Sequence, residues 1–170
     1  MSQYLRDGVL DLDDFELPSK QRREKGRVII IECVQEIPCN PCSEICPRNA
    51  ITIKGDITNI PQVDFEKCNG CGICIANCPG LAIFSVNESL GQEMAEVGIP
   101  YEFKPLPETG DSVDLIDRAG QVVGTGTVKR VLQPKSYDRT ALIYLMVPRE
   151  LSLQIRFFRK SLKSGNKKKS

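Results

Sequence analysis

All eight cysteines of this 170-residue chain lie in its first half, between Cys33 and Cys78. Six of them recur when the sequence is shifted so that Cys39 falls on Cys71, because the pattern C-x2-C-x3-C-P-x2-A-I is present twice. The matching pairs are Cys39 and Cys71, Cys42 and Cys74, Cys46 and Cys78, Pro47 and Pro79, Ala50 and Ala82, and Ile51 and Ile83. Six identities at one offset and in one order indicate an internal duplication, and they predict a single module lined by cysteines.

Cys68 precedes the second copy and completes the spacing C-x2-C-x2-C-x3-C-P, which ends at Pro79. This is the cysteine spacing of bacterial iron–sulfur proteins. Three thiolates two residues apart can turn around one iron–sulfur cube while backbone N–H groups of the loop face its sulfides. Gly70 and Gly72 allow the tight backbone and close approach that such a loop requires. The spacing therefore indicates a cluster on the first three cysteines of this run, whose fourth cysteine points away to ligate another cluster.

Residues 28–85 resemble the dicluster ferredoxins of bacteria, and this resemblance rests on the repeated cysteine motif. It implies a pseudo-twofold βαββαβ domain that holds two [4Fe–4S] clusters. It also implies that each cluster takes three cysteines from one half and a distant fourth cysteine from the other half. The ligand sets implied by the resemblance are Cys33, Cys39, Cys42 and Cys78 for cluster one, and Cys46, Cys68, Cys71 and Cys74 for cluster two.

Cys33 is the implied ligand that departs from the family spacing. Five residues separate it from Cys39, three more than in the second run, and the shift that relates the two copies places Cys33 on Phe65 rather than on Cys68. One interpretation is a wider loop over residues 34–38 that still returns the Cys33 thiolate to the cluster. The alternatives are a three-iron cluster at this site, or a Cys33 side chain that is only a buried thiol.

Zinc sites and disulfide bonds are the other common uses of clustered cysteines. A structural zinc site usually pairs two C-x2-C knuckles, whereas this chain has three closely spaced cysteines and a remote one, twice. Disulfides need an oxidising compartment, for which the sequence carries no signal. The chain also has no histidine, which excludes His-ligated zinc, Rieske clusters, His-ligated haem and catalysis by Ser-His or Cys-His pairs. The cysteines are therefore where redox chemistry is expected.

The remaining composition predicts a soluble cytoplasmic protein. No basic N-terminal segment leads into an apolar stretch of signal-peptide length, and the longest apolar run, Ala141–Val147, is too short for a membrane helix. The formal net charge of +1 argues against a dedicated nucleic-acid binder. Gly124-Thr125-Gly126 lacks the third glycine of a dinucleotide loop, so we expect neither a nucleotide nor a flavin site on this chain.

We expect an α+β chain in which the cysteine module is one of five segments. These are an N-terminal arm at 1–27, the dicluster ferredoxin domain at 28–85, a linker or short helix at 86–98, a small barrel-like all-β domain at 99–155, and a basic disordered tail at 156–170. The arm is expected to be extended, and either to lie along a partner or to fray. The tail is expected to be a solvated end, with binding to RNA or anionic lipid as the alternative.

Four β-like runs predict the strands of the last domain. These runs are Ile99–Lys104, Ser112–Asp117, Gln121–Leu132 and Thr140–Val147. Gly124 and Gly126 interrupt the third run and predict a bulge or sharp bend in a curled sheet. The helix formers Met94 and Ala95 favour a short helix before these strands.

Two clusters without an evident substrate site predict that the chain moves electrons for another protein. The whole chain resembles the small iron–sulfur subunits of multi-subunit flavin-dependent amino-acid dehydrogenases of the proline, hydroxyproline and opine type. This resemblance rests on Arg27–Cys33, Cys39–Pro47 and the C-terminal β segment. It implies a hetero-oligomer whose partner subunits hold FAD or FMN and oxidise the substrate, while this chain is not catalytic alone.

Two other functions fit the same cysteines. A free ferredoxin needs little more than the central module, so its C-terminal segment would be an addition without a role in docking. A scaffold or nucleic-acid-binding protein would use its clusters only to stabilise the fold. The first alternative predicts a stable monomer, and the second predicts that reduction of the clusters is irrelevant to function.

Overall fold

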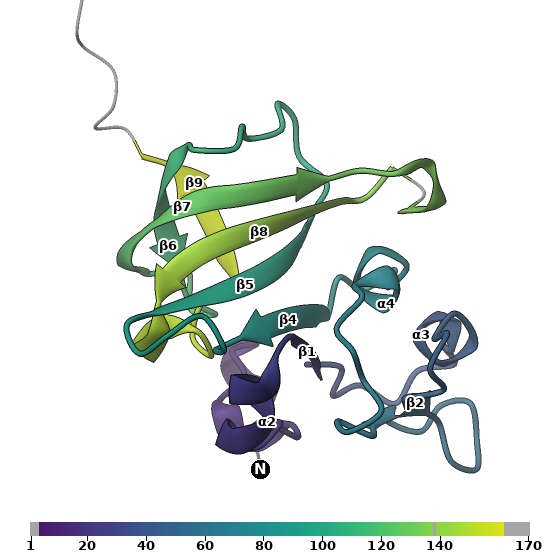
Figure 1. Ribbon diagram of the computed structural model, residues 1–170. Coiled ribbons are helices and arrows are strands. Elements are labelled where there is room, and N and C mark those ends of the chain that lie inside the picture. The colour runs from purple at the N-terminus through teal and green to yellow at the C-terminus, as the bar shows by residue number, and fades with distance from the viewer. Residues whose placement is uncertain (1–3, 138, 162–170) are drawn as a thin grey trace, which may run out of the picture.

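The computed structural model describes residues 4–137 and 139–161, and most of its regular structure is one antiparallel sheet (Figure 1). The seven strands of this sheet follow the order β1-β4-β5-β8-β7-β6-β9, and a separate ladder pairs β2 with β3. The helical segments are α1 Tyr4–Asp7, η1 Leu12–Asp14, α2 Lys20–Lys25, α3 Pro41–Glu44, α4 Ile73–Ala76, η2 Lys135–Tyr137 and η3 Arg149–Leu151. This mixture of sheet and short helices confirms the α+β class. Within the described residues, no helix has the length and apolar character needed to cross a membrane.

Residues 28–87 contain two structurally similar halves. Their elements are β1 Val28–Ile31, α3, β2 Ile51–Thr52, β3 Gln62–Val63, α4 and β4 Ile83–Asn87. The order is therefore strand, helix, strand, strand, helix, strand, and the shift that carries Cys39 onto Cys71 also carries α3 onto α4. The strand pairing repeats with the same shift, because Ile51 pairs with Val63 in the β2–β3 ladder and Ile83 pairs with Ile31 in the β4–β1 ladder.

The turns that follow the two short helices also match each other. Asn49 and Leu81, which occupy equivalent positions in the two halves, have positive φ angles of 48° and 51°. The backbone N–H of Asn49 donates to the carbonyl of Cys46, and that of Leu81 donates to the carbonyl of Cys78, both at 3.1 Å. Few non-glycine residues adopt such φ angles. The sequence duplication is therefore also a duplication of backbone geometry.

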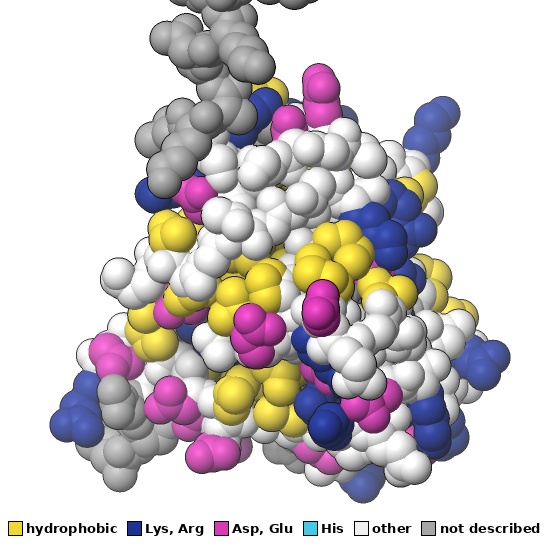
Figure 2. Space-filling model, turned by 60° about the vertical axis from the view of Figure 1, so that its left-hand side comes forward, with side chains coloured by type: hydrophobic (Ala, Val, Ile, Leu, Met, Phe, Trp, Pro, Cys, Tyr) yellow, Lys and Arg dark blue, Asp and Glu magenta, His cyan; other side chains and the backbone are white. Residues whose placement is uncertain are grey.

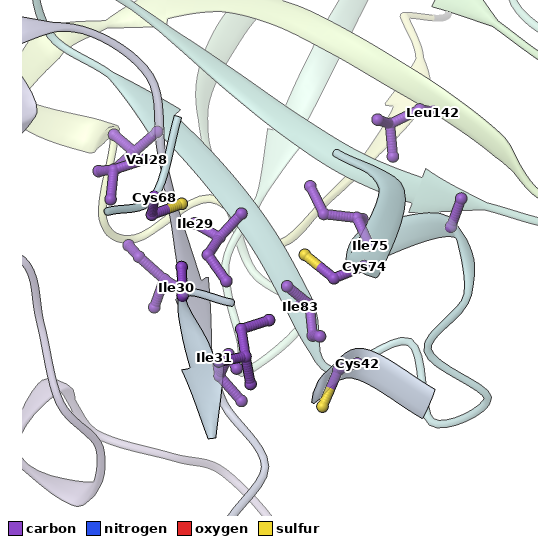
Figure 3. Packing of buried hydrophobic residues seen from close by; sticks show 14 of the residues in the cluster. Val28, Ile29, Ile30, Ile31, Cys42, Cys68, Cys74, Ile75, Ile83 and Leu142 are labelled. Carbon is purple, nitrogen blue, oxygen red and sulfur yellow. The ribbon is translucent and has the colours of Figure 1, made fainter. Parts of the chain in front are cut away.

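The cysteine module packs around β1, whose four residues Val-Ile-Ile-Ile are all buried. An unbroken β-branched run of this kind is typical of a strand that is covered on both faces. Ile75 of α4, Ile83 of β4 and Leu142 of β8 belong to the same core cluster (Figure 3). Side chains from both parts of the chain thus meet in this core.

The larger part of the sheet is formed by the strands that follow the cysteine module. They are β5 Met94–Tyr101, β6 Ser112–Ile116, β7 Val122–Leu132, β8 Ala141–Pro148 and β9 Phe157–Lys160. The first residues of β6, β7 and β8 lie within one position of the predicted runs, which confirms those three strands. The β6–β7 ladder pairs Leu115 with Gly124 and Ile116 with Val122, so Val123 forms the bulge that the two glycines predicted.

The sheet curls strongly, as Figure 1 shows. Tyr101 of β5 stacks on Phe158 of β9 with the ring centroids 5.1 Å apart, although three other strands lie between β5 and β9 in the sheet order. Val97, Leu115 and the other inward side chains of these strands form a second core cluster on the inside of the curl.

Residues 86–98 form a β-hairpin instead of the expected linker or short helix. Ser85 of β4 pairs with Gly98 of β5, and Asn87 pairs with Glu96. Because β5 lies between β4 and β8, Ala95 is fully buried, and this packing outweighs the helix preference of the local sequence. The sheet therefore runs without interruption across the expected boundary between the two domains.

Both terminal segments contain regular structure that the sequence did not predict. The arm is not extended throughout, because α2 forms within it, and the Ser19 hydroxyl accepts a hydrogen bond from the Arg22 backbone N–H at 3.1 Å. At the other end, β9 lies within the segment expected to be disordered, and Arg156 is buried. The rest of the expected tail, residues 162–170, lies outside the described residues.

Candidate metal centres

Two small cavities within residues 28–87 are each lined by four cysteine side chains. The first cavity is lined by Cys33, Cys39, Cys42 and Cys78, and the second by Cys46, Cys68, Cys71 and Cys74. In each cavity three thiols come from one half of the module and the fourth comes from the other half. The structure brings together the same two sets that the resemblance implies, while their role as cluster ligands stays a prediction.

The first cavity lies beside the end of β1, whose last residue, Ile31, is part of the lining. Cys33 is half-buried, and its thiol accepts a hydrogen bond from the backbone N–H of Gln35. Burial raises the pKa of Cys33; this hydrogen bond opposes the effect, and the neighbouring Cys78 and Cys39 thiols reinforce it. Burial, with a contribution from Cys78, raises the pKa of Cys42 to about 11. The wider loop thus brings Cys33 to the other three cysteines.

The second cavity combines buried and exposed thiols. Cys68 and Cys74 are buried, whereas Cys71 is exposed. Burial raises the pKa of Cys74, and the neighbouring thiols of Cys68, Cys71 and Cys46 raise it further. Figure 3 shows the sulfur atoms of Cys68 and Cys74 turned toward each other across Ile29, which also lines this cavity. Thiols with raised pKa values hold their protons at neutral pH, so metal binding at this site would release protons.

Backbone N–H groups donate to cysteine sulfur atoms in both halves. The donor–acceptor pairs are Ala50 to Cys46 at 3.3 Å, Ala82 to Cys78 at 3.5 Å, and Gly70 to Cys68 at 3.4 Å. The first two pairs occupy equivalent positions in the two copies of the repeat. A donor directed at sulfur stabilises the thiolate over the thiol, and such donors also help to set the potential of a cluster.

Gly70 and Gly72 shape the loop that carries Cys68 and Cys71. Their φ angles are +64° and +88°, in the region that favours glycine. A Cβ atom on Gly70 would lie 2.6 Å from Cγ of Arg27, and one on Gly72 would lie 2.7 Å from a Leu142 methyl carbon. Both glycines therefore supply the tight backbone that the sequence predicted, while the predicted approach of this loop to a cluster stays a prediction. The close neighbours are an arginine next to β1 and a leucine of β8.

The donor chemistry of the two cavities fits iron–sulfur clusters. Among residues 4–137 and 139–161, no group of three or more cysteine, aspartate or glutamate side chains could hold a single metal ion. The eight thiols instead line the walls of two cavities. A four-iron cluster takes one thiolate at each of its four separated iron atoms, and N–H groups donate to its sulfur atoms. Four cysteines per cavity, with N–H donors close by, supply those groups.

Sequence reasoning missed two contributions from outside the cysteine module. The Arg22 guanidinium of α2 donates to the carbonyl of Phe65 at 2.6 Å and to the carbonyl of Cys68. The Tyr144 hydroxyl oxygen of β8 would lie 3.1 Å from a Cβ atom on Gly72, so this strand covers the cluster-two loop. Neither residue carries a local signal for this contact, because the loop that carries Cys68 and Gly72 is far from both in the sequence.

Comparisons with known proteins agree with this geometry. Residues 32–82 match the family of the 4Fe–4S dicluster domain. Ferredoxin-type protein NapF of Haemophilus influenzae is 41% identical over 59 residues, which are 32% of this chain and 34% of the relative. An uncharacterized ferredoxin of Methanocaldococcus jannaschii is 43% identical over 74 residues, or 42% of this chain and 45% of the relative. One subunit of an ion-translocating oxidoreductase complex of Methanosarcina acetivorans is 39% identical over 61 residues, or 35% and 22%.

The family match covers residues 32–82, and the chain spans less than half the length of each of these relatives. No solved structure matches the chain. The duplicated backbone, the two cysteine-lined cavities and the family match all concern the same segment. Residues 32–82 therefore resemble a 4Fe–4S dicluster domain of the ferredoxin type in sequence, backbone duplication and cysteine placement.

Proposed function

We propose that this chain is an electron-transfer subunit of a larger oxidoreductase. In this proposal it passes single electrons through two [4Fe–4S] clusters between the flavin of a partner subunit and an acceptor. The observation that carries the proposal is the pair of cavities, each with four cysteines. Because each cavity borrows one cysteine from the other half, both clusters belong to one compact module. Two neighbouring redox groups in such a module form a relay, whereas a purely structural role needs no pair.

A groove in the curled sheet supports docking of a partner. It has a volume of about 720 Å³ and lies between the segment after β5 and the β7–β8 connection. Phe103 in its wall is 60% exposed, and Lys104, Lys135 and Arg139 lie around it. The lining also includes one carboxylate, Glu102, so the groove carries a net positive charge around an exposed aromatic ring. Such a surface suits a partner segment that carries apolar and acidic side chains. Figure 2 shows that hydrophobic side chains also reach the surface elsewhere, interspersed with charged ones.

The partner identity rests on resemblance alone. The chain resembles the iron–sulfur subunits of flavin-dependent dehydrogenases for proline, hydroxyproline or opines, so the proposed partners hold FAD or FMN and oxidise such a substrate. A relative with a similar cysteine module is named as a subunit of an oxidoreductase complex, which supports a complex in general. Under this proposal the isolated chain has no turnover of its own.

The test is anaerobic purification of the tagged full chain from its own cells, followed by counting of iron, sulfide and flavin. We expect two four-iron clusters per chain and co-purifying flavoprotein subunits. Addition of L-proline, hydroxyproline or an opine should then bleach the flavin and reduce the clusters. A flavin-free monomer with reducible clusters would favour a free ferredoxin, and clusters that resist dithionite would favour a structural role. A sample with zinc or without inorganic sulfide would overturn the proposal.

The docking groove has a separate test. Phe103→Asp should abolish co-purification of the flavoprotein subunits and leave the absorption of the clusters unchanged. Leu90→Asp is the matched control, because Leu90 is 40% exposed in the β4–β5 turn and does not line the groove. Retention of the partners by the Phe103 variant would show that the groove is not the docking site.

A further inference from the structure

Arg22 is a buried cation whose guanidinium contacts the loop that carries Cys68, whereas the exposed Arg48 lines the second cavity itself. The Arg22 side chain is on α2, and the residue is only 8% exposed. The guanidinium donates to four backbone carbonyls: those of Phe65 at 2.6 Å, Gly26 at 3.1 Å, Arg27 at 3.2 Å, and Cys68. These bonds fix the guanidinium against the loop that carries Cys68, but carbonyl groups hold no formal charge.

Arg22 differs from the buried Arg156 and from the partly buried Arg23 of the same helix in having no carboxylate partner. Arg23 pairs with Glu88 at 2.9 Å, and Arg156 pairs with Glu32. Within the described residues, no Asp or Glu forms an ion pair with Arg22. A buried charge is costly unless another charge pairs with it. The positive charge of Arg22 therefore has no counter-charge among the described residues.

We propose that Arg22 is the counter-charge of cluster two and raises the reduction potential of that cluster. The inference rests on the proposed function, because it requires a cluster at Cys46, Cys68, Cys71 and Cys74. A cluster with four thiolate ligands is anionic. When an electron donor reduces it by one electron, the cluster gains a further negative charge. A fixed cation nearby stabilises the reduced form more than the oxidised form. Arg22 is thus a positioning residue that acts on the cluster through its charge and through the Cys68 carbonyl.

Cluster one has a different charged neighbourhood. Glu32 precedes Cys33, and its carboxylate receives hydrogen bonds from both Arg118 and Arg156. These two cations share a carboxylate, and neither donates to a cysteine carbonyl within the described part of the chain. Substitution of Arg22 should therefore change the potential of one cluster and leave that of the other unchanged.

The test uses the full chain, reconstituted anaerobically with iron and sulfide and titrated with dithionite under electron paramagnetic resonance. We expect Arg22→Gln to shift one of the two potentials to a more negative value. Arg22→Lys, which keeps the charge, should retain most of the parent potential. Arg23→Gln is the matched control, since Arg23 is on the same helix and in a partly buried ion pair but, among the described residues, forms no side-chain hydrogen bond with the cysteine loop. It should shift neither potential.

A second variant assigns the shift to a cluster. Cys71→Ser should remove cluster two, and adding Arg22→Gln to that variant should leave the remaining potential unchanged. Equal shifts in Arg22→Gln and Arg22→Lys would overturn the charge role, as would a shift of both clusters or none. If Arg22→Gln loses cluster two altogether, the Arg22→Lys protein decides, because the inference requires it to keep that cluster at nearly the parent potential. A parent chain without two reducible clusters would instead overturn the proposed function, which is a distinguishable result.

Discussion

The Arg156 guanidinium bonds the carboxylate of Glu32 across 124 positions of sequence. Both side chains are nearly inaccessible to solvent, and Glu32 directly precedes Cys33. Burial lowers the pKa of Arg156 to about 10, while the attraction of Glu32 opposes that change, so the arginine is charged at neutral pH. The pair ties the segment before the last strand to the start of the cluster-one loop.

Removal of one partner from this pair should destabilise the fold. Arg156→Met leaves the Glu32 charge buried with Arg118 as its remaining partner, and we expect a loss of about 3 kcal/mol in the free energy of unfolding. Arg159→Met is the control, because the Arg159–Asp114 pair at 3.2 Å involves an exposed arginine and should change stability by less than about 1 kcal/mol. Denaturant unfolding of both variants measures the difference. Equal losses in the free energy of unfolding would show that the buried Arg156–Glu32 pair contributes no more than the exposed Arg159–Asp114 pair.

Glu96 should give the protein a component of acid sensitivity. Burial raises its pKa, but hydrogen bonds from Lys129 and Arg27 outweigh that effect and hold the pKa below its usual value of 4.5. A carboxyl whose folded pKa lies below the unfolded value stabilises the fold above the unfolded pKa and loses that contribution as the pH falls through the folded pKa. The stability difference between the parent and Glu96→Gln should therefore shrink as the pH falls below that usual value. Glu150→Gln, at an exposed site outside this ion-pair network, is the matched control.

Gly72→Ala should disrupt the second cavity. The positive φ angle alone costs an alanine about 1–2 kcal/mol, and the added Cβ atom would also clash with Leu142 of β8 at 2.7 Å. Gly110→Ala isolates the φ effect, since Gly110 has a φ angle of +96° and a Cβ atom there would meet no other atom within 4 Å. We expect iron and sulfide analysis to show loss of cluster content only in the Gly72 variant. Equal cluster content in both variants would contradict the role of close packing at this loop.

Cys71→Ser should lower the iron and sulfide content of the chain by about half, because one four-iron cluster loses a ligand. Under the proposed function, electron flow to the acceptor should stop, while the substrate should still bleach the flavin of the proposed partner subunit. The chain offers no cysteine outside the proposed ligand sets as a matched control, because each of its eight cysteines lines one of the two cavities. Full iron content in the Cys71 variant would exclude this cysteine as a ligand.

Cys33→Ser separates the three interpretations of the unusual spacing. If Cys33 ligates cluster one, the variant should lose that cluster or convert it to a three-iron form with a distinct paramagnetic signal in the oxidised state. If Cys33 is only a buried thiol, the parent and the variant should have the same spectra. A three-iron signal already present in the parent would show that the site lacks a fourth ligand.

The sequence predicted those features whose determinants lie close together in the chain. The repeated cysteine motif, through the family resemblance that rests on it, predicted both sets of thiols, and the β-branched runs located β6, β7 and β8. The hairpin at 86–98 was missed because Met94 and Ala95 favour a helix locally. They form a strand because β5 is buried between β4 and β8. Arg22 and Arg156 were missed because the groups they bind lie 46 and 124 residues away.

The unbroken sheet has a consequence for how this chain can be divided. β4 pairs with β1 on one side and, over its last three residues, with β5 on the other, so cutting the chain after residue 85 would remove two residues of β4 together with the strand beside it. A bare strand edge of apolar residues invites association with other chains. An excised minimal ferredoxin from this protein should therefore aggregate. The C-terminal strands keep the cysteine module soluble, in addition to any role in assembly.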